Sequence, residues 1–94
     1  LPSAVVLASP STKPGQGGSA LRCGLPGESR VSLVLFDQQG RRIRDLVNGT
    51  LAAGEHVATW DGRDNVGRRA PSGLYFVRLE AGGRTLTQRL VAIQ

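Results

Sequence analysis

The sequence predicts an all-β fold, and three observations lead to this prediction. Thirteen glycines and five prolines are spread between short apolar segments, which favours many turns and short strands over helices. Within several of these segments apolar and polar residues alternate, as they do in a strand that buries one face. No window shows a sustained apolar period of about 3.6 residues with helix caps. Strand signals recur about every ten to fifteen residues, close to the spacing expected of a β-sandwich.

Length and composition limit the domain organisation. The 94 residues, 39% of them hydrophobic, are enough for one core and leave no room for a second, so we expect a single domain over residues 1–94. No apolar run approaches the ~20 residues of a membrane-spanning helix, so no membrane span is expected. The chain begins at Leu1, contains no methionine and shows no signal-peptide pattern, so we expect a mature or excised part of a larger protein.

The first half of the chain supplies four predicted strands, of which residues 30–37 alternate most clearly. The strands are expected at residues 1–8, as an edge strand, and at 20–25, 30–37 and 41–47. Residues 9–19 contain two prolines and three glycines and therefore predict a loop. Asn48 and Gly49 form the strongest two-residue reversal signal in the chain, alone or within a longer loop.

The second half is organised around residues 59–83, which hold the only tryptophan and the only tyrosine. Strands are expected at residues 54–61, 73–80 and 85–93, with a tight hairpin at 81–83. Strand phase turns four side chains of this stretch inward, so we expect them in the core: Trp60, Tyr75, Val77 and Leu79. Tyr75 is also expected to hydrogen-bond the backbone through its hydroxyl, as in the tyrosine corner of some sandwiches.

Three segments together carry a family resemblance. They are Val31-Ser-Leu-Val-Leu-Phe-Asp-Gln-Gln-Gly-Arg41, Ala53-Gly-Glu-His-Val-Ala-Thr-Trp-Asp-Gly-Arg-Asp64 and Ser72-Gly-Leu-Tyr-Phe-Val-Arg-Leu79. In this order they resemble the FlgD-like immunoglobulin domain, and the resemblance runs from about residue 9 to the end of the chain. It implies an immunoglobulin-like (fibronectin III-like) antiparallel β-sandwich of about seven strands.

This family includes the outer domain of the flagellar hook-capping protein. It also overlaps with the C-terminal sorting domains of proteins exported by the type IX secretion system. The chain departs from the sorting pattern in two places: no Asn precedes Pro10, with no aromatic residue after it, and the chain ends Arg89-Leu-Val-Ala-Ile-Gln94 without the usual lysine motif. These departures affect the sorting hypothesis and not the fold.

One segment has the residue types of a calcium loop. Asp61, Asp64 and Asn65 place three oxygen-bearing side chains within five positions, and calcium prefers several such oxygens. The segment lacks the bidentate Glu of an EF-hand and is rich in arginine. We therefore expect Asp61 and Asp64 to accept backbone N–H bonds within a turn, and we expect no metal or other cofactor. Gly62 and Gly73, like Gly40, suit turns with positive φ or close approach.

Candidate catalytic residues are scarce. Cys23 is the only cysteine, which excludes an intrachain disulfide, and its phase with Leu21 and Leu25 predicts a buried apolar thiol. His56 is the only histidine and lies in phase with Trp60, as expected of a packed core or rim residue. No nucleophile–base pair or pair of carboxylates suggests an enzyme. An exposed sugar-stacking platform of Trp60 and Tyr75 is the alternative to their place in the core.

The charge balance suggests which partners to consider. Eleven arginines and one lysine against seven acids give a formal net charge of +5, which permits binding to anionic partners. The basic residues are scattered and no nucleic-acid motif is present, so we expect no nucleic acid as a partner. An acidic-glycan-binding module remains one alternative function.

The leading functional hypothesis is a non-catalytic C-terminal accessory domain of a secreted or surface bacterial protein, as the resemblance implies. Such a domain would act in export and sorting or in cell-surface attachment, and would be found outside the cell or on its surface after crossing the periplasm. Its expected partners are the upstream domain of its own parent chain and the secretion machinery, and we expect a monomer in isolation. A structural spacer or assembly module, as in the hook cap, is the other alternative.

Overall fold

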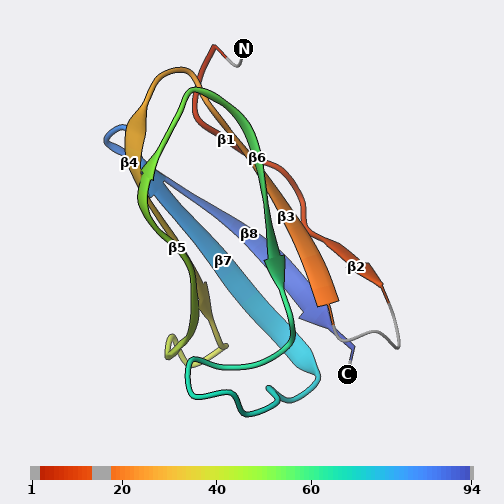
Figure 1. Ribbon diagram of the computed structural model, residues 1–94. Coiled ribbons are helices and arrows are strands. Elements are labelled where there is room, and N and C mark those ends of the chain that lie inside the picture. The colour runs from red at the N-terminus through yellow and green to blue at the C-terminus, as the bar shows by residue number, and fades with distance from the viewer. Residues whose placement is uncertain (1–2, 14–17, 94) are drawn as a thin grey trace.

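The computed structural model describes residues 3–13 and 18–93, and every regular element in this part of the chain is a β-strand. Figure 1 shows two layers of strands packed face to face. The strands are β1 (Val6–Leu7), β2 (Ser11–Lys13), β3 (Gly18–Leu25), β4 (Ser29–Phe36), β5 (Arg42–Leu51), β6 (Gly54–Trp60), β7 (Gly73–Ala81) and β8 (Arg84–Ala92). Among the described residues no helix could cross a membrane.

Each layer is an antiparallel sheet. The first sheet is centred on β3, which pairs with β6 from Ser19 to Leu25 and with both β1 and β2. Because β6 occupies one edge of β3, β1 and β2 must lie one after the other along its opposite edge. The second sheet has the order β5-β4-β7-β8. The predicted immunoglobulin-like sandwich is confirmed, since β1 and β2 together fill the place of one of about seven strands.

The core lies between the inner faces of the two sheets. Alternation along β4 places Val31, Leu33 and Leu35 there, each fully buried. Tyr75 and Val77 lie beside them on the neighbouring strand β7 of the same sheet, and belong to the same cluster. The remaining core residues are Val5, Leu7, Leu21, Cys23, Leu25, Trp60, Ala70, Leu79, Ala81, Leu90 and Ala92. Burial of these apolar side chains is the main favourable term that holds the sheets together.

The predicted reversal at Asn48 and Gly49 is wrong. Both residues lie inside β5, where Asn48 pairs with Ser32 and Gly49 with Val31. The chain instead passes from one sheet to the other after Leu51, through Ala52 and Ala53. The side-chain oxygen of Asn48 also accepts a 2.7 Å hydrogen bond from the Arg30 guanidinium on β4. Cross-strand pairing to β4 therefore overrides the local turn preference.

The predicted loop over residues 9–19 is correct only in part. Ser11–Lys13 forms β2, and Gly18 and Ser19 begin β3; the four residues between them lie outside the described part of the chain. An edge strand is held by backbone hydrogen bonds to one neighbour and needs no apolar alternation, so its sequence gave no strand signal. Pro10 lies between β1 and β2, where it has no N–H to donate to the ladder. Leu1 and Pro2 of the predicted first strand are also outside the described residues.

Candidate functional site

The loop between β6 and β7 is anchored by the two aromatic residues that precede and follow it. The rings of Trp60 and Tyr75 meet edge to face, with centroids 5.3 Å apart and an interplanar angle of 62°. Trp60 Nε1 donates a 2.8 Å hydrogen bond to the carbonyl oxygen of Arg63. The Tyr75 hydroxyl donates to the carbonyl oxygen of Pro71. Trp60 is only 1% exposed and Tyr75 is also buried, so neither ring is available as a platform for a sugar.

The carboxylates of the loop accept bonds from its own backbone. Asp61 Oδ1 accepts from the N–H of Arg63 at 3.0 Å. Asp64 Oδ1 accepts from the N–H groups of Val66 at 3.0 Å and Arg68 at 2.9 Å. These are Asx-type turns, in which a side-chain oxygen replaces a backbone acceptor. Gly62, with φ of 83°, and Gly73, with φ of 150°, take backbone conformations that L side chains rarely adopt.

A guanidinium already occupies the cation position of this loop. Arg44 Nη1 on β5 donates to Asp61 Oδ1 at 3.4 Å, to the carbonyl oxygen of Arg63 at 3.3 Å and to that of Asp64 at 3.1 Å. In the described residues no group of three or more His, Cys, Asp or Glu side chains could hold a metal ion. The sequence does not single out Arg44, because its contact with residues about 20 positions away leaves no local signal.

Asn65, the third candidate ligand, is also engaged by β5. Its side-chain oxygen accepts a 3.0 Å hydrogen bond from the N–H of Asp45, and its own N–H donates to the carbonyl oxygen of Ile43 at 3.0 Å. Both groups of β5 lie on the edge that faces away from β4. These two bonds hold the loop against this part of the β5 edge.

Register brings Cys23 and His56 together, which the sequence did not indicate. They are directly opposite each other on β3 and β6. Burial raises the pKa of the Cys23 thiol above its ordinary value, which disfavours the thiolate that a nucleophile requires. The Nε2 of His56 lies 2.8 Å from the carbonyl oxygen of Ala52, so this nitrogen carries the proton and donates it. Cys23 therefore contributes to packing, and His56 ties β6 to the connection between β5 and β6.

A second turn, between β4 and β5, is organised by Asp37. Its Oδ1 accepts from the N–H groups of Gln39 and Arg41, each at 2.9 Å, and its Oδ2 accepts from Arg41 Nε at 2.8 Å. Desolvation alone would raise the pKa of Asp37. The bonds from Arg41 and Gln39 outweigh it, so the pKa lies below its ordinary value.

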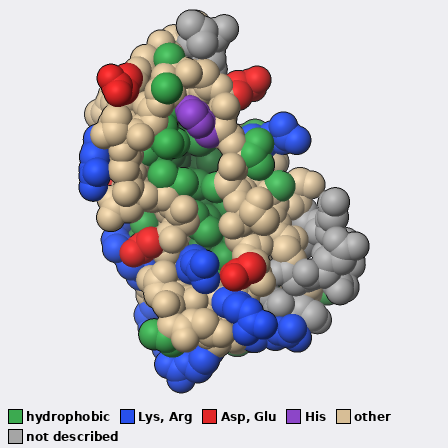
Figure 2. All heavy atoms as spheres, in the orientation of Figure 1, with side chains coloured by type: hydrophobic (Ala, Val, Ile, Leu, Met, Phe, Trp, Pro, Cys, Tyr) green, Lys and Arg blue, Asp and Glu red, His purple; other side chains and the backbone are tan. Residues whose placement is uncertain are grey.

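One flank of the sandwich leaves core side chains partly accessible. Five hydrophobic residues there are partly buried and pack on the core: Ile43, Leu46, Val47, Leu51 and Ala58. Figure 2 shows hydrophobic side chains gathered between β5 and β6 on this flank. On the opposite flank Gln88 of β8 donates a 2.9 Å hydrogen bond to the carbonyl oxygen of Leu7. That flank also has a partly buried hydrophobic residue packed on the core, Leu86.

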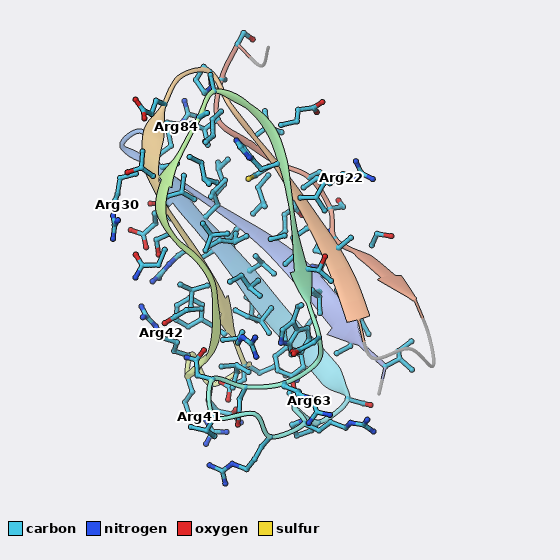
Figure 3. All side chains as sticks on the ribbon, viewed as in Figure 1. Arg22, Arg30, Arg41, Arg42, Arg63 and Arg84 are labelled. Atoms are coloured by element: carbon cyan, nitrogen blue, oxygen red, sulfur yellow. The ribbon has the colours of Figure 1, made fainter. Side chains whose placement is uncertain are left out.

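The outer faces of the two sheets also differ. That of the β3-centred sheet carries exposed Val6 and Val57, and a hollow of about 590 Å³ lies over Gly24 between Arg22 and Glu55. The outer face of the other sheet carries Phe36 and Phe76 among several arginines. Figure 3 shows Arg30 and Arg42 on the opposite side of the sandwich from Arg22. The molecule thus presents two chemically distinct surfaces.

Solved structures with the same fold come from bacterial assemblies. FlgD from Pseudomonas aeruginosa superposes with a TM-score of 0.67 at 24% identity, over 95% of this chain and 70% of that chain. PorZ of Porphyromonas gingivalis, described as an essential bacterial surface component of the type IX secretion system, gives 0.62 at 20% identity. That match covers 96% of this chain and 11% of PorZ. At these identities the likeness is one of fold.

Sequence comparison gives the family. The basal-body rod modification proteins FlgD of Salmonella typhimurium and Escherichia coli are each 39% identical to this chain over 59 residues, or 61% of its length. The chain spans about a quarter of the length of these relatives (25% and 26%). The model of the FlgD Ig-like domain family matches residues 9–84. The chain therefore belongs to the FlgD Ig-like domain family.

Proposed function

We propose that this domain is a non-catalytic accessory module of a larger bacterial protein, and that it acts in export and sorting or in attachment at the cell surface. The observation that carries the proposal is that the candidate chemical groups are engaged in holding the fold. Asp61, Asp64 and Asn65 bind backbone groups and β5. Cys23 is buried with a raised pKa, and His56 donates to a carbonyl oxygen. What remains for function is the folded surface.

The comparisons with known proteins support a role in a bacterial surface or flagellar system. Family membership relates the chain to proteins named for the flagellar basal body, and one structure of the same fold belongs to a surface component of a secretion system. We infer that the module lies at the C-terminus of its parent protein, functions outside the cytoplasm, and contacts its upstream domain and the secretion machinery.

Export of a fusion protein tests the sorting function. Residues 1–94 would be fused to the C-terminus of a periplasmic reporter in a host with an active type IX system. The reporter is expected in the medium or on the cell surface, and to stay in the periplasm when the outer-membrane translocon is deleted. A matched fusion with Trp60→Ala, which removes the buried ring that anchors the 61–72 loop, is expected to stay in the periplasm as well. Periplasmic retention of the unmutated fusion would contradict the sorting function.

A second candidate is a structural module in an extracellular assembly. The 39% identity to the rod modification proteins favours it, because that identity extends over 59 residues. The test replaces the matching domain of Salmonella FlgD with residues 1–94 of this chain, which include β1 and β8, and measures swimming in soft agar. Restored swimming supports the assembly function. A stable chimaera that leaves the cells non-motile argues against it.

A further inference from the structure

Two phenylalanines lie between two arginines on the outer face of the β5-β4-β7-β8 sheet. Register places Arg42 beside Phe36, Phe36 beside Phe76, and Phe76 beside Arg89. Since adjacent strands lie ~4.8 Å apart, these four residues form a row ~14 Å long across the whole sheet. The neighbouring residues Leu35, Tyr75, Val77 and Leu90 belong to the core, so this Phe–Arg row faces outward.

Apolar side chains extend the row on both sides. Val34 precedes Phe36 by one outward position and is 2% exposed, although it is not part of the core cluster. Leu74 pairs with Val91, which is 56% exposed, on the other side of the row. Both phenylalanines are themselves only half-buried. The centre of this outer face is therefore apolar, whereas the outer face of a sheet exposed to solvent is usually polar.

The charges around this centre are incompletely balanced. Arg30, Arg42, Arg78 and Arg89 share the face with two acids. Each acid already has an arginine partner: Asp45 lies 3.3 Å from Arg42, and Glu80 lies 3.4 Å from Arg78. Arg78 also stacks on Phe36, with its guanidinium carbon 4.5 Å from the centre of the ring, and its buried Nε is the atom that lies 3.4 Å from Glu80 Oε1. Among the described residues, Arg30 and Arg89 have no acidic partner, although Arg30 donates a hydrogen bond to the side chain of Asn48.

The other outer face lacks this combination. Among the side chains described on the β3-centred sheet, the outward charged residues are Arg22 and Glu55, one of each sign. Its apolar residues are the separate valines Val6 and Val57, each about half exposed. Isolated exposed valines are ordinary on protein surfaces. The positive charge and the clustered aromatic residues therefore coincide on one face only.

We propose that the Phe–Arg row is the docking surface for a partner protein whose contact surface has an apolar centre and an acidic rim. Charge complementarity selects an acidic partner, since Arg30 and Arg89, which have no acidic partner among the described residues, lie on the same face as the apolar centre. A protein fits better than an acidic glycan, because aromatic residues and arginine are the residues enriched in protein interfaces. The half-buried phenyl rings also carry no hydroxyl or amide to bind sugar hydroxyls. This inference rests on the proposed function: binding such a partner is how the accessory module would act in export or in assembly.

Defined polymers test the proposal with the full 94-residue chain. The probes are a glutamate–tyrosine copolymer, which has acidic and apolar side chains, poly-L-glutamate of equal charge, and polygalacturonate as an acidic glycan. Affinities would be measured by fluorescence anisotropy over a range of salt concentrations. We expect the copolymer to bind most tightly, and Arg89→Glu to weaken its binding about tenfold. Phe76→Ser should reduce copolymer binding to the level of poly-L-glutamate.

Arg22→Glu is the matched control, because it makes the same charge change at an exposed arginine on the opposite face. Equal losses for Arg22→Glu and Arg89→Glu would overturn the proposal, since binding would then follow net charge alone. Tighter binding of polygalacturonate, unaffected by Phe76→Ser, would identify a glycan site instead. Absence of saturable copolymer binding would also overturn it. Reporter export and polymer binding are separate measurements, so a failure of the sorting function can be distinguished from a failure of the docking surface.

Discussion

The guanidinium of Arg44 lies 3.1 Å from the carbonyl oxygen of Asp64, and this contact joins β5 of one sheet to the loop that leaves the other. A positive charge thus sits among the oxygens that would otherwise attract a cation. Asn65 makes a second connection from the same loop to the same strand. The loop is therefore part of the sandwich architecture.

The first prediction concerns calcium and Asp64. Millimolar calcium is expected to leave the melting temperature unchanged, because Arg44 already interacts with the candidate oxygens. Asp64→Ala should destabilise the chain by about 1–2 kcal/mol through the loss of its backbone bonds. Asp45→Ala, which removes a carboxylate from an exposed ion pair, should cost less than about 1 kcal/mol. A calcium-dependent rise in melting temperature that disappears in Asp64→Ala would show a metal site after all.

The second prediction concerns the Tyr75 hydroxyl. Tyr75→Phe keeps the ring contact with Trp60 and removes the donor to Pro71, so the free energy of unfolding should fall by about 1 kcal/mol in urea titrations. Trp60→Ala removes a whole buried ring and should cost about 3–5 kcal/mol. If Tyr75→Phe and Trp60→Ala lowered the free energy of unfolding equally, packing of the Trp60 ring would contribute no more than the Tyr75 hydrogen bond.

The third prediction concerns acid stability. The folded-state pKa of Asp37 lies below its ordinary value of 3.8, so the carboxylate stabilises the fold fully above that pH. The stabilisation is lost as the pH falls through the lower, folded-state pKa. Asp37→Asn should therefore reduce stability at neutral pH and flatten the dependence of stability on pH below about pH 4. The free energy of unfolding would be measured by urea titration at several pH values between 2 and 5. The same dependence on pH in Asp37→Asn and in the unmutated chain would exclude this role.

The fourth prediction concerns the Cys23 thiol. It is 6% exposed and its pKa is raised by burial, so alkylation by iodoacetamide at pH 8 should be slow in the folded chain and fast in denaturant. The rate should follow opening of the structure and should not change when His56 is replaced by Gln. Rapid labelling of the folded chain that slows in His56→Gln would instead indicate an activated thiol.

Strands with strong alternation could be predicted from the sequence, because burying one face of a strand imposes a period of two. Residues 30–37 and 73–80 correspond closely to β4 and β7, and the expected sandwich is confirmed. The reversal signal of Asn48 and Gly49 was misleading, because a weak local turn preference competes with the regular pairing of residues 47–51 to β4. Residues 11–13 gave no signal, since an edge strand depends on its neighbour more than on its own side chains.

The contacts between distant segments could not be predicted in the same way. Sequence reasoning placed Asp61, Asp64 and Asn65 in one local turn, but Arg44 and the β5 edge reach them only in the folded chain. The Phe–Arg row likewise brings together residues of four strands, and depends on registers that include two irregularities between β4 and β5. A one-residue change in register would turn its side chains to the other face.

The bonds that Asn65 makes to Ile43 and Asp45 have a consequence for self-association. An outer strand with free N–H and C=O groups is a template on which strands of other molecules can stack. Here a single residue occupies a donor and an acceptor of β5, so an incoming strand would have to displace the chain's own loop before it could extend the sheet. The loop between β6 and β7 thereby protects this part of the β5 edge from pairing with a strand of another molecule.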